Sequence, residues 1–132
     1  MTSDFIGIDI SKATLDAHRL NDSAKAQFSN NKTGYKSLHK WLKGSDVTCI
    51  IYEPTGPYHR AFEEAFTQSF PLAKVNPLQA RRFAQAHGTR AKTDQVDARM
   101  LAVMGQALSV KPQAPASKEQ RDLKELQVAR QG

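Results

Sequence analysis

Four acidic residues occupy positions at which a carboxylate is costly unless something compensates its charge. Asp9 and Glu53 each end an apolar segment that reads as a strand, while Asp94 and Asp97 lie three residues apart at the head of an amphipathic stretch. A charged group beside apolar packing loses hydration and must find a partner. A pair of divalent cations would compensate all four carboxylates at once.

The chemistry that suits such a set of carboxylates is phosphodiester cleavage. Hard cations such as Mg²⁺ and Mn²⁺ prefer oxygen ligands. Two of them, roughly 4 Å apart, can activate a water or hydroxyl and stabilise the leaving oxygen at a phosphodiester. The sequence therefore predicts a site for Mg²⁺ or Mn²⁺, with two ions, in which Asp9, Glu53, Asp94 and Asp97 are the ligands and catalytic residues.

Each acid also has a plainer interpretation. Asp9 could cap the turn that follows its strand, and Glu53 could be an exposed acid at a strand end. Asp94 could be a helix N-cap, with Asp97 favouring the positive end of the helix dipole. These alternatives remain open at this point for every acid taken alone.

Asp97 has a further feature, which is its expected place on a helix face. On a helix starting at Thr93 or Asp94, Asp97 shares a face with Leu101, Met104 and Leu108. An apolar face should pack on a sheet, so we expect Asp97 to point toward the interior edge. Burial there favours a ligand role over a purely structural one.

The positive charge is concentrated beside the acidic pair. The 132 residues carry a formal net charge of +6, and the sequence pI is about 9.6. The stretch from residue 74 to 99 contains only two acids, Asp94 and Asp97. Basic residues around a metal site suggest a polyanion held close to it, although a solvated basic surface is the alternative. The candidate nucleic-acid contacts are Lys12, Arg81, Arg82, Arg90, Lys92 and Arg99.

The elements that must position these residues alternate in type along the chain. Apolar runs and alternation predict strands, and helical spacing with capping residues predicts helices. Strands first, then alternating helix and strand, indicate an α/β fold with a mixed sheet and helices packed on it. The expected strands are 5–10, 13–20, 25–29, 47–53 and 71–75; the expected helices begin at Thr33, Pro57, Asn76-Pro77 and Thr93 or Asp94, the last running to about Leu108.

The length suits one domain, which we place at residues 1–110. Pro112 and Pro115 mark a linker, and Ser117 opens a capping box before a further helix. We therefore expect 111–132 to be a linker and the start of a truncated helix or coiled coil. One cysteine, no apolar run of about 20 residues and no signal peptide favour a cytoplasmic protein without a membrane segment.

Three separate motifs occur in an order that resembles a known family. They are Ile6-Gly7-Ile8-Asp9-Ile10-Ser11-Lys12, Tyr52-Glu53-Pro54-Thr55-Gly56 and Lys92-Thr93-Asp94-Gln95-Val96-Asp97-Ala98. The set resembles the DEDD insertion-sequence transposases, which are relatives of the pilin-gene-inverting recombinase. The resemblance covers about residues 5–110.

The resemblance implies a ribonuclease H-like, RuvC-like domain in which Asp9, Glu53, Asp94 and Asp97 form the DEDD metal site. It implies DNA as substrate, both as element ends and as target, and a structured guide RNA as a further partner. It also implies a coiled coil, a downstream domain with a nucleophilic serine, and a homo-oligomer of the full-length protein. The chain would then hold metal and nucleic acid without recombining DNA alone.

Other classes of protein share parts of this pattern. An actin-like sugar kinase or ATPase also begins with an apolar strand, Gly-x-Asp and a turn with Ser and Lys, but this chain lacks the length for two lobes. A stand-alone resolvase or nuclease would use the same acids. A non-catalytic module would bind nucleic acid through its basic segment and use the acids structurally.

Overall fold

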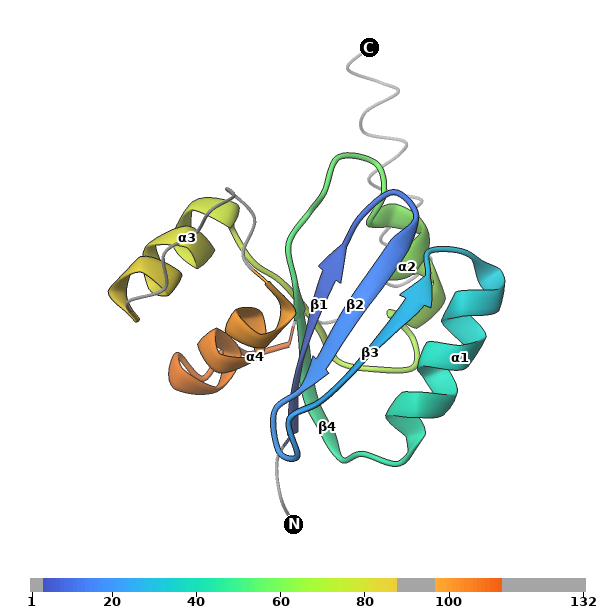
Figure 1. Ribbon diagram of the computed structural model, residues 1–132, viewed down its shortest axis with the longest axis horizontal. Helices are drawn as coiled ribbons and strands as arrows, with labels where there is room; N and C mark the ends of the chain where they lie inside the picture. Colours follow the sequence, from blue (N-terminus) through green and yellow to red (C-terminus); the bar gives the residue numbers. More distant parts are fainter. Residues whose placement is uncertain (1–3, 88–96, 113–132) are drawn as a thin grey trace, which may run out of the picture.

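A five-stranded mixed sheet forms the centre of the protein in the computed structural model, which describes residues 4–87 and 97–112. The strand order is β3-β2-β1-β4-β5. Four helices complete the described part of the chain (Figure 1). The elements are β1 Asp4–Ile10, β2 Thr14–Arg19, β3 Ala24–Ser29, α1 Lys32–Lys43, β4 Val47–Tyr52, α2 Arg60–Phe66, β5 Leu72–Lys74, α3 Pro77–Ala86 and α4 Ala98–Ala107.

The sheet combines an antiparallel half with a parallel half. Strands β1, β2 and β3 pair antiparallel as a meander, while β1 pairs parallel with β4 and β4 with β5. Strands β1 and β4 are internal, and their nearly continuous burial explains why their sequences are apolar without alternation. The mixed sheet with flanking helices confirms the predicted fold class.

The two faces of the sheet are covered by different pairs of helices. Figure 1 shows α1 and α2 on one side of the sheet and α3 and α4 on the other. Alternating residues of β1 face opposite ways, so Ile6, Ile8 and Ile10 join the core under α1 and α2. Phe5 joins the second core, together with Met100 and Leu101 of α4. Residues in register with Phe5 therefore face α4.

Two helix starts differ from the prediction. Helix α1 is capped by Asn31, whose Oδ1 accepts from Gly34 N at 2.9 Å, and Thr33 lies inside the first turn. Helix α2 begins at Arg60, so Pro57 lies in the turn before it. The predicted start of α3 is confirmed, since the Asn76 side chain caps it and Pro77 follows as the first helical residue.

Helix α4 begins later than predicted. Asp97 has an extended backbone, with φ −73° and ψ 167°, and its side chain accepts from Met100 N at 2.8 Å. It is therefore the N-cap of a helix that starts at Ala98, and a helix running through it from Thr93 or Asp94 is wrong. A capping aspartate and one in the first turn have the same spacing to the apolar residues that follow, which is why periodicity could not separate them.

The remaining expectations about organisation fall partly outside the described residues. The domain limit at 110 and the linker and helix over 111–132 stay predictions, because residues 113–132 are not described. Across 4–87 and 97–112, no helix has the length and apolar character needed to cross a membrane.

Candidate metal centre

Asp9 and Glu53 come together at the carboxyl ends of two neighbouring parallel strands. Gly7 of β1 pairs with Ile51 of β4, and each acid lies two residues further along its own strand direction. The period of two puts both side chains on the face that carries Gly7 and Ile51, which is the face toward α4. The pairing predicted between these two acids therefore follows from strand register.

Glu53 is held in surroundings that disfavour its charge. Its Oε1 is buried and has no hydrogen-bond partner among the described residues. Burial, and then the negative charge of Asp9, raise the pKa of the Glu53 carboxyl to about 7, while the positive charge of Arg81 acts in the opposite direction. A bound cation would satisfy the buried oxygen and offset the repulsion between the two acids.

The loop after β4 is fixed by its own hydrogen bonds, and these position Glu53. Thr55 donates from its hydroxyl to the Glu53 carbonyl at 3.2 Å, and Thr55 N donates to His59 Nδ1 at 3.1 Å. The next residue, Gly56, has φ +53°, a conformation that favours glycine. On the other face of the sheet, the Tyr52 hydroxyl donates to Glu63 of α2. Hydrogen bonds of Tyr52 and Thr55 thus hold the chain on both sides of Glu53.

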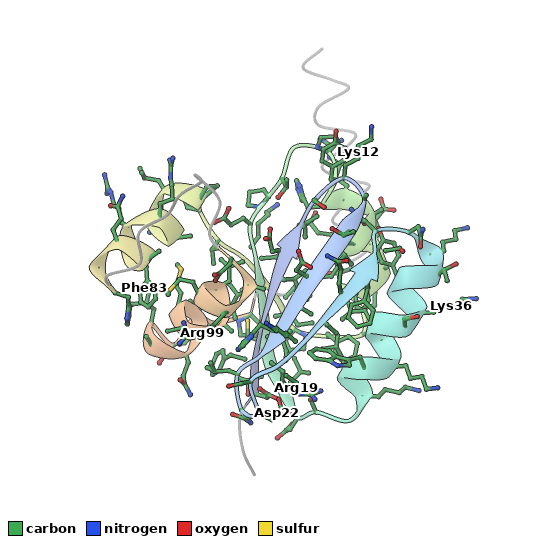
Figure 2. All side chains as sticks on the ribbon, viewed as in Figure 1. Lys12, Arg19, Asp22, Lys36, Phe83 and Arg99 are labelled. Atoms are coloured by element: carbon green, nitrogen blue, oxygen red, sulfur yellow. The ribbon has the colours of Figure 1, made fainter. Side chains whose placement is uncertain are left out.

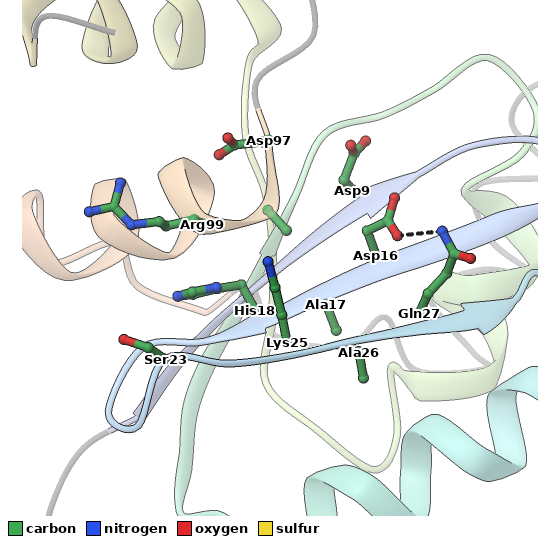
Figure 3. A pocket seen from close by; sticks show the side chains of 11 residues that line it. Asp9, Asp16, Ala17, His18, Ser23, Lys25, Ala26, Gln27, Asp97 and Arg99 are labelled. Carbon is green, nitrogen blue, oxygen red and sulfur yellow. Dashed lines mark hydrogen bonds between the residues drawn. The ribbon is translucent and has the colours of Figure 1, made fainter.

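Asp97 lies on the helix side of the groove and Asp9 on the strand side, because α4 packs directly on β1. A Cβ at Gly7 would lie 1.8 Å from the Ala98 carbonyl oxygen, so only glycine allows this contact. Asp9 and Asp97 line the same groove, and Figure 3 shows both side chains at its rim. Asp97 is exposed, however, so the prediction that it points toward the interior edge is wrong.

The donor chemistry of these acids fits a divalent cation. Asp9 and Glu53 provide adjacent carboxylates, and Glu53 contributes an oxygen that no protein group satisfies. Within 4–87 and 97–112, no three acidic, histidine or cysteine side chains are close enough to share one ion. Asp94, the fourth predicted ligand, lies outside the described residues.

The groove contains further residues that the sequence prediction missed. Asp16 of β2 lies directly opposite Asp9 of β1 and accepts a hydrogen bond from Gln27 Nε2 at 2.8 Å. His18 and Lys25 form the next pair on this face. The signal was present in the sequence, because a β2 strand with Leu15 and Ala17 inward must turn Asp16 and His18 to the other face.

The predicted basic residues divide among several places. Arg81 of α3 lies near enough to Glu53 to affect its pKa, and Arg99 of α4 lines the groove with Asp9. Arg82 lines a different groove, between α3 and α4. Lys12 is exposed in the turn between β1 and β2 (Figure 2). Arg90 and Lys92 lie outside the described residues.

Comparison with known proteins agrees with this arrangement. The family model for DEDD transposases, described as "Transposase", matches residues 6–132. The chain belongs to the DEDD transposase family. Among its relatives are the pilin gene-inverting proteins of Moraxella bovis and Moraxella lacunata, each 34% identical over 112 residues, which are 80% of this chain. The chain spans only 35% of the length of either relative.

The fold is ribonuclease H-like. RuvC of T. thermophilus, solved in complex with a Holliday junction substrate, superposes with a TM-score of 0.53 and 12% sequence identity. The match covers 85% of this chain and 100% of that one. The RuvC-like fold implied by the three motifs is thereby confirmed.

Proposed function

We propose that this chain is the metal-binding catalytic domain of a DNA transposase or site-specific recombinase, acting on DNA phosphodiesters. One observation carries the proposal: Asp9 and Glu53 are neighbours at the ends of parallel strands, and a buried Glu53 oxygen has no partner in the described residues. In a member of the DEDD transposase family, a carboxylate pair of this kind is best explained as half of a metal site.

The four acids would act together as metal ligands. Asp9 and Glu53 would hold the ions from the sheet, and Asp97 and Asp94 would complete the site from the start of α4 and the segment before it. Two Mg²⁺ or Mn²⁺ ions supply, when bound, activation of an attacking oxygen and stabilisation of the leaving oxygen. The rigid β1 and β4 strand ends keep the two sheet carboxylates in place during this step.

The basic residues would hold the sugar-phosphate backbone. Arg81 is near enough to Glu53 for its charge to lower the Glu53 pKa, so it is suited to a phosphate at the metal centre itself. Arg99 lines the groove beside Asp97. Lys12, Arg82, Arg90 and Lys92 would contact phosphates further along the nucleic acid.

The remaining parts of the proposal concern the context of the domain. We place it at residues 1–110, followed by a linker and helix over 111–132. A downstream domain with a nucleophilic serine, a structured guide RNA and a homo-oligomer of the full-length protein would complete the recombination machinery. We infer a cytoplasmic, DNA-associated protein of a bacterium or an archaeon.

A DNA-binding measurement with and without metal tests this function. In EDTA, the negative charges of the carboxylates repel phosphate, so Mn²⁺ should tighten binding of a labelled DNA oligonucleotide to the chain by about tenfold or more, which is 1.4 kcal/mol. The Asp9→Asn, Glu53→Gln double variant should lose this dependence. Equal affinity of the wild-type chain in Mn²⁺ and in EDTA would overturn the proposal.

A further inference from the structure

The groove beside Asp9 and Asp16 has a second end, which is lined by a histidine and two cations and has Asp97 at its rim. It has a volume of about 740 Å³ and runs between the β2–β3 hairpin and the start of α4. Figure 3 shows Asp9 and Asp16 toward one end and His18, Lys25 and Arg99 toward the other. On the α4 face of the hairpin, Lys25 and Gln27 of β3 are exposed, whereas His18 of β2 is buried.

His18 is the residue at this end that needs an explanation. It is 7% exposed, and its Nε2 is buried with no hydrogen-bond partner in the described residues. Burial lowers the pKa of His18, and the positive charge of Arg99 lowers it further. A buried polar atom without a partner is unfavourable, because it loses its hydrogen bonds to water. No hydrogen bond from the described residues to His18 Nε2 offsets this loss.

Two cations on different elements lie near His18. Lys25 is its cross-strand neighbour in β3, and Arg99 of α4 is near enough for its charge to lower the His18 pKa, while the charge of Asp97 acts in the opposite direction. Neither cation forms an ion pair within 4–87 and 97–112. Arg99 is moreover the second residue of α4, where the positive end of the helix dipole disfavours a cation. The dipole at this helix start favours an anion over a cation.

We propose that His18, Lys25 and Arg99 form a binding site for a backbone phosphate of the DNA strand whose neighbouring phosphodiester lies at Asp9 and Glu53. Lys25 and Arg99 hold the phosphate from the exposed side with long, flexible side chains. His18 supplies a donor at the floor of the groove once these side chains move onto the phosphate. The identity of the ligand as DNA rests on the proposed function. The site would direct the bound DNA strand along the β2–β3 hairpin.

The test is binding of a fluorescein-labelled single-stranded DNA of about 20 nucleotides to the 132-residue chain, followed by anisotropy over a range of salt concentrations at a fixed Mn²⁺ concentration. Lys25→Gln and Arg99→Gln should each weaken binding several-fold and reduce the slope of log K against log[salt] by about 0.7, the value for one lost contact to a single strand. Lys36→Gln is the matched control, because Lys36 is exposed on α1, across the sheet from Arg99 (Figure 2).

His18→Leu separates the ligand role from a structural one. It removes an unpartnered buried polar atom, so the melting temperature should not fall, whereas DNA binding should weaken with little change in the salt slope. His18→Gln, which retains a donor, should bind more tightly than His18→Leu. The proposal is overturned if Lys25→Gln and Arg99→Gln match the Lys36→Gln control, or if His18→Leu binds like the wild type. Lys25→Gln and Arg99→Gln should retain the tightening by Mn²⁺ that the Asp9→Asn, Glu53→Gln variant loses, so failure here is distinguishable from failure of the metal-site proposal.

Discussion

Glu53 is a carboxyl group whose surroundings favour the protonated form, and that property links stability to function at the scale of one residue. Its pKa near 7 reflects burial and the neighbouring Asp9. An acid with a purely structural role would not be stabilised in its ionised form at this position. A bound cation would coordinate the Glu53 carboxylate and offset the effect of burial. The ionised group therefore destabilises the fold without metal and binds metal when it is present.

Glu53→Gln should make stability less dependent on pH. The folded pKa lies above that of the unfolded chain, so the folded state binds more protons between about pH 4.5 and pH 7, and the wild type loses stability as pH rises through that range. The variant should be more stable than the wild type by roughly 1 kcal/mol near pH 8, allowing for partial solvent screening, and about equal near pH 4.5.

Urea unfolding in metal-free buffer at the two pH values measures the difference. Glu53→Asp retains an ionisable carboxyl and should keep the fall in stability with rising pH. A stability difference between Glu53→Gln and the wild type that is the same at both pH values would contradict the pKa assigned to Glu53.

Asp97 combines a cap and a proposed ligand, and two substitutions separate these roles. Asparagine is as good an N-cap as aspartate, so Asp97→Asn should change the free energy of unfolding little, while Asp97→Ala should lower it by about 1 kcal/mol. Both variants should weaken Mn²⁺ binding. Wild-type Mn²⁺ affinity in Asp97→Asn would show that Asp97 is a cap alone.

At the scale of elements, the position of α4 on β1 decides whether the carboxylates can meet. Gly7 permits the contact with the Ala98 backbone, and Gly105 lies against Ile51 of β4. Helix α4 is therefore pressed onto the strands that carry Asp9 and Glu53, with its capped start beside the acids. This close packing brings the start of α4 and the ends of β1 and β4 together at one site.

Gly7→Ala should displace α4 and destabilise the fold. The added Cβ would lie 1.8 Å from a backbone oxygen that cannot move alone, so we expect a loss of about 3 kcal/mol, the upper end for overpacking. Gly44→Ala is the matched control, because nothing lies within 4 Å of its Cβ and its φ is −79°. Urea unfolding compares them, and similar losses in both variants would contradict the close packing.

Much of this arrangement could be predicted from the sequence, for reasons that differ between elements. The β1 and β4 strands are apolar runs that end in an acid, so their type and the site at their ends were both visible. The start of α4 was not, because Asp94 and Asp97 are both good caps before the same apolar residues. The groove at Asp16 and His18 depends on hairpin register, which periodicity implies only once the pairing of β1 with β2 is fixed.

At the scale of the whole molecule, the two faces of the sheet have separate roles. The α1 and α2 face is closed by aliphatic and aromatic packing, including Tyr52, Phe62 and Phe66. The α3 and α4 face carries the acids, Arg81 and Arg99, and the hairpin extends it beyond the helices as a groove. Both faces therefore contain an apolar core, and the α3 and α4 face carries in addition the charged groups of the proposed sites.

The most direct test of the account is a titration of Mn²⁺ into the chain with DNA present to complete the coordination shell, followed by the electron paramagnetic resonance signal of free Mn²⁺. We predict saturable binding in the wild type and a loss of about tenfold or more in affinity in the Asp9→Asn, Glu53→Gln double variant. The control is Asp46→Asn, Glu64→Gln, which removes the same charge at exposed positions and should bind as the wild type does. Equal affinity in the two double variants would contradict a metal site at Asp9 and Glu53.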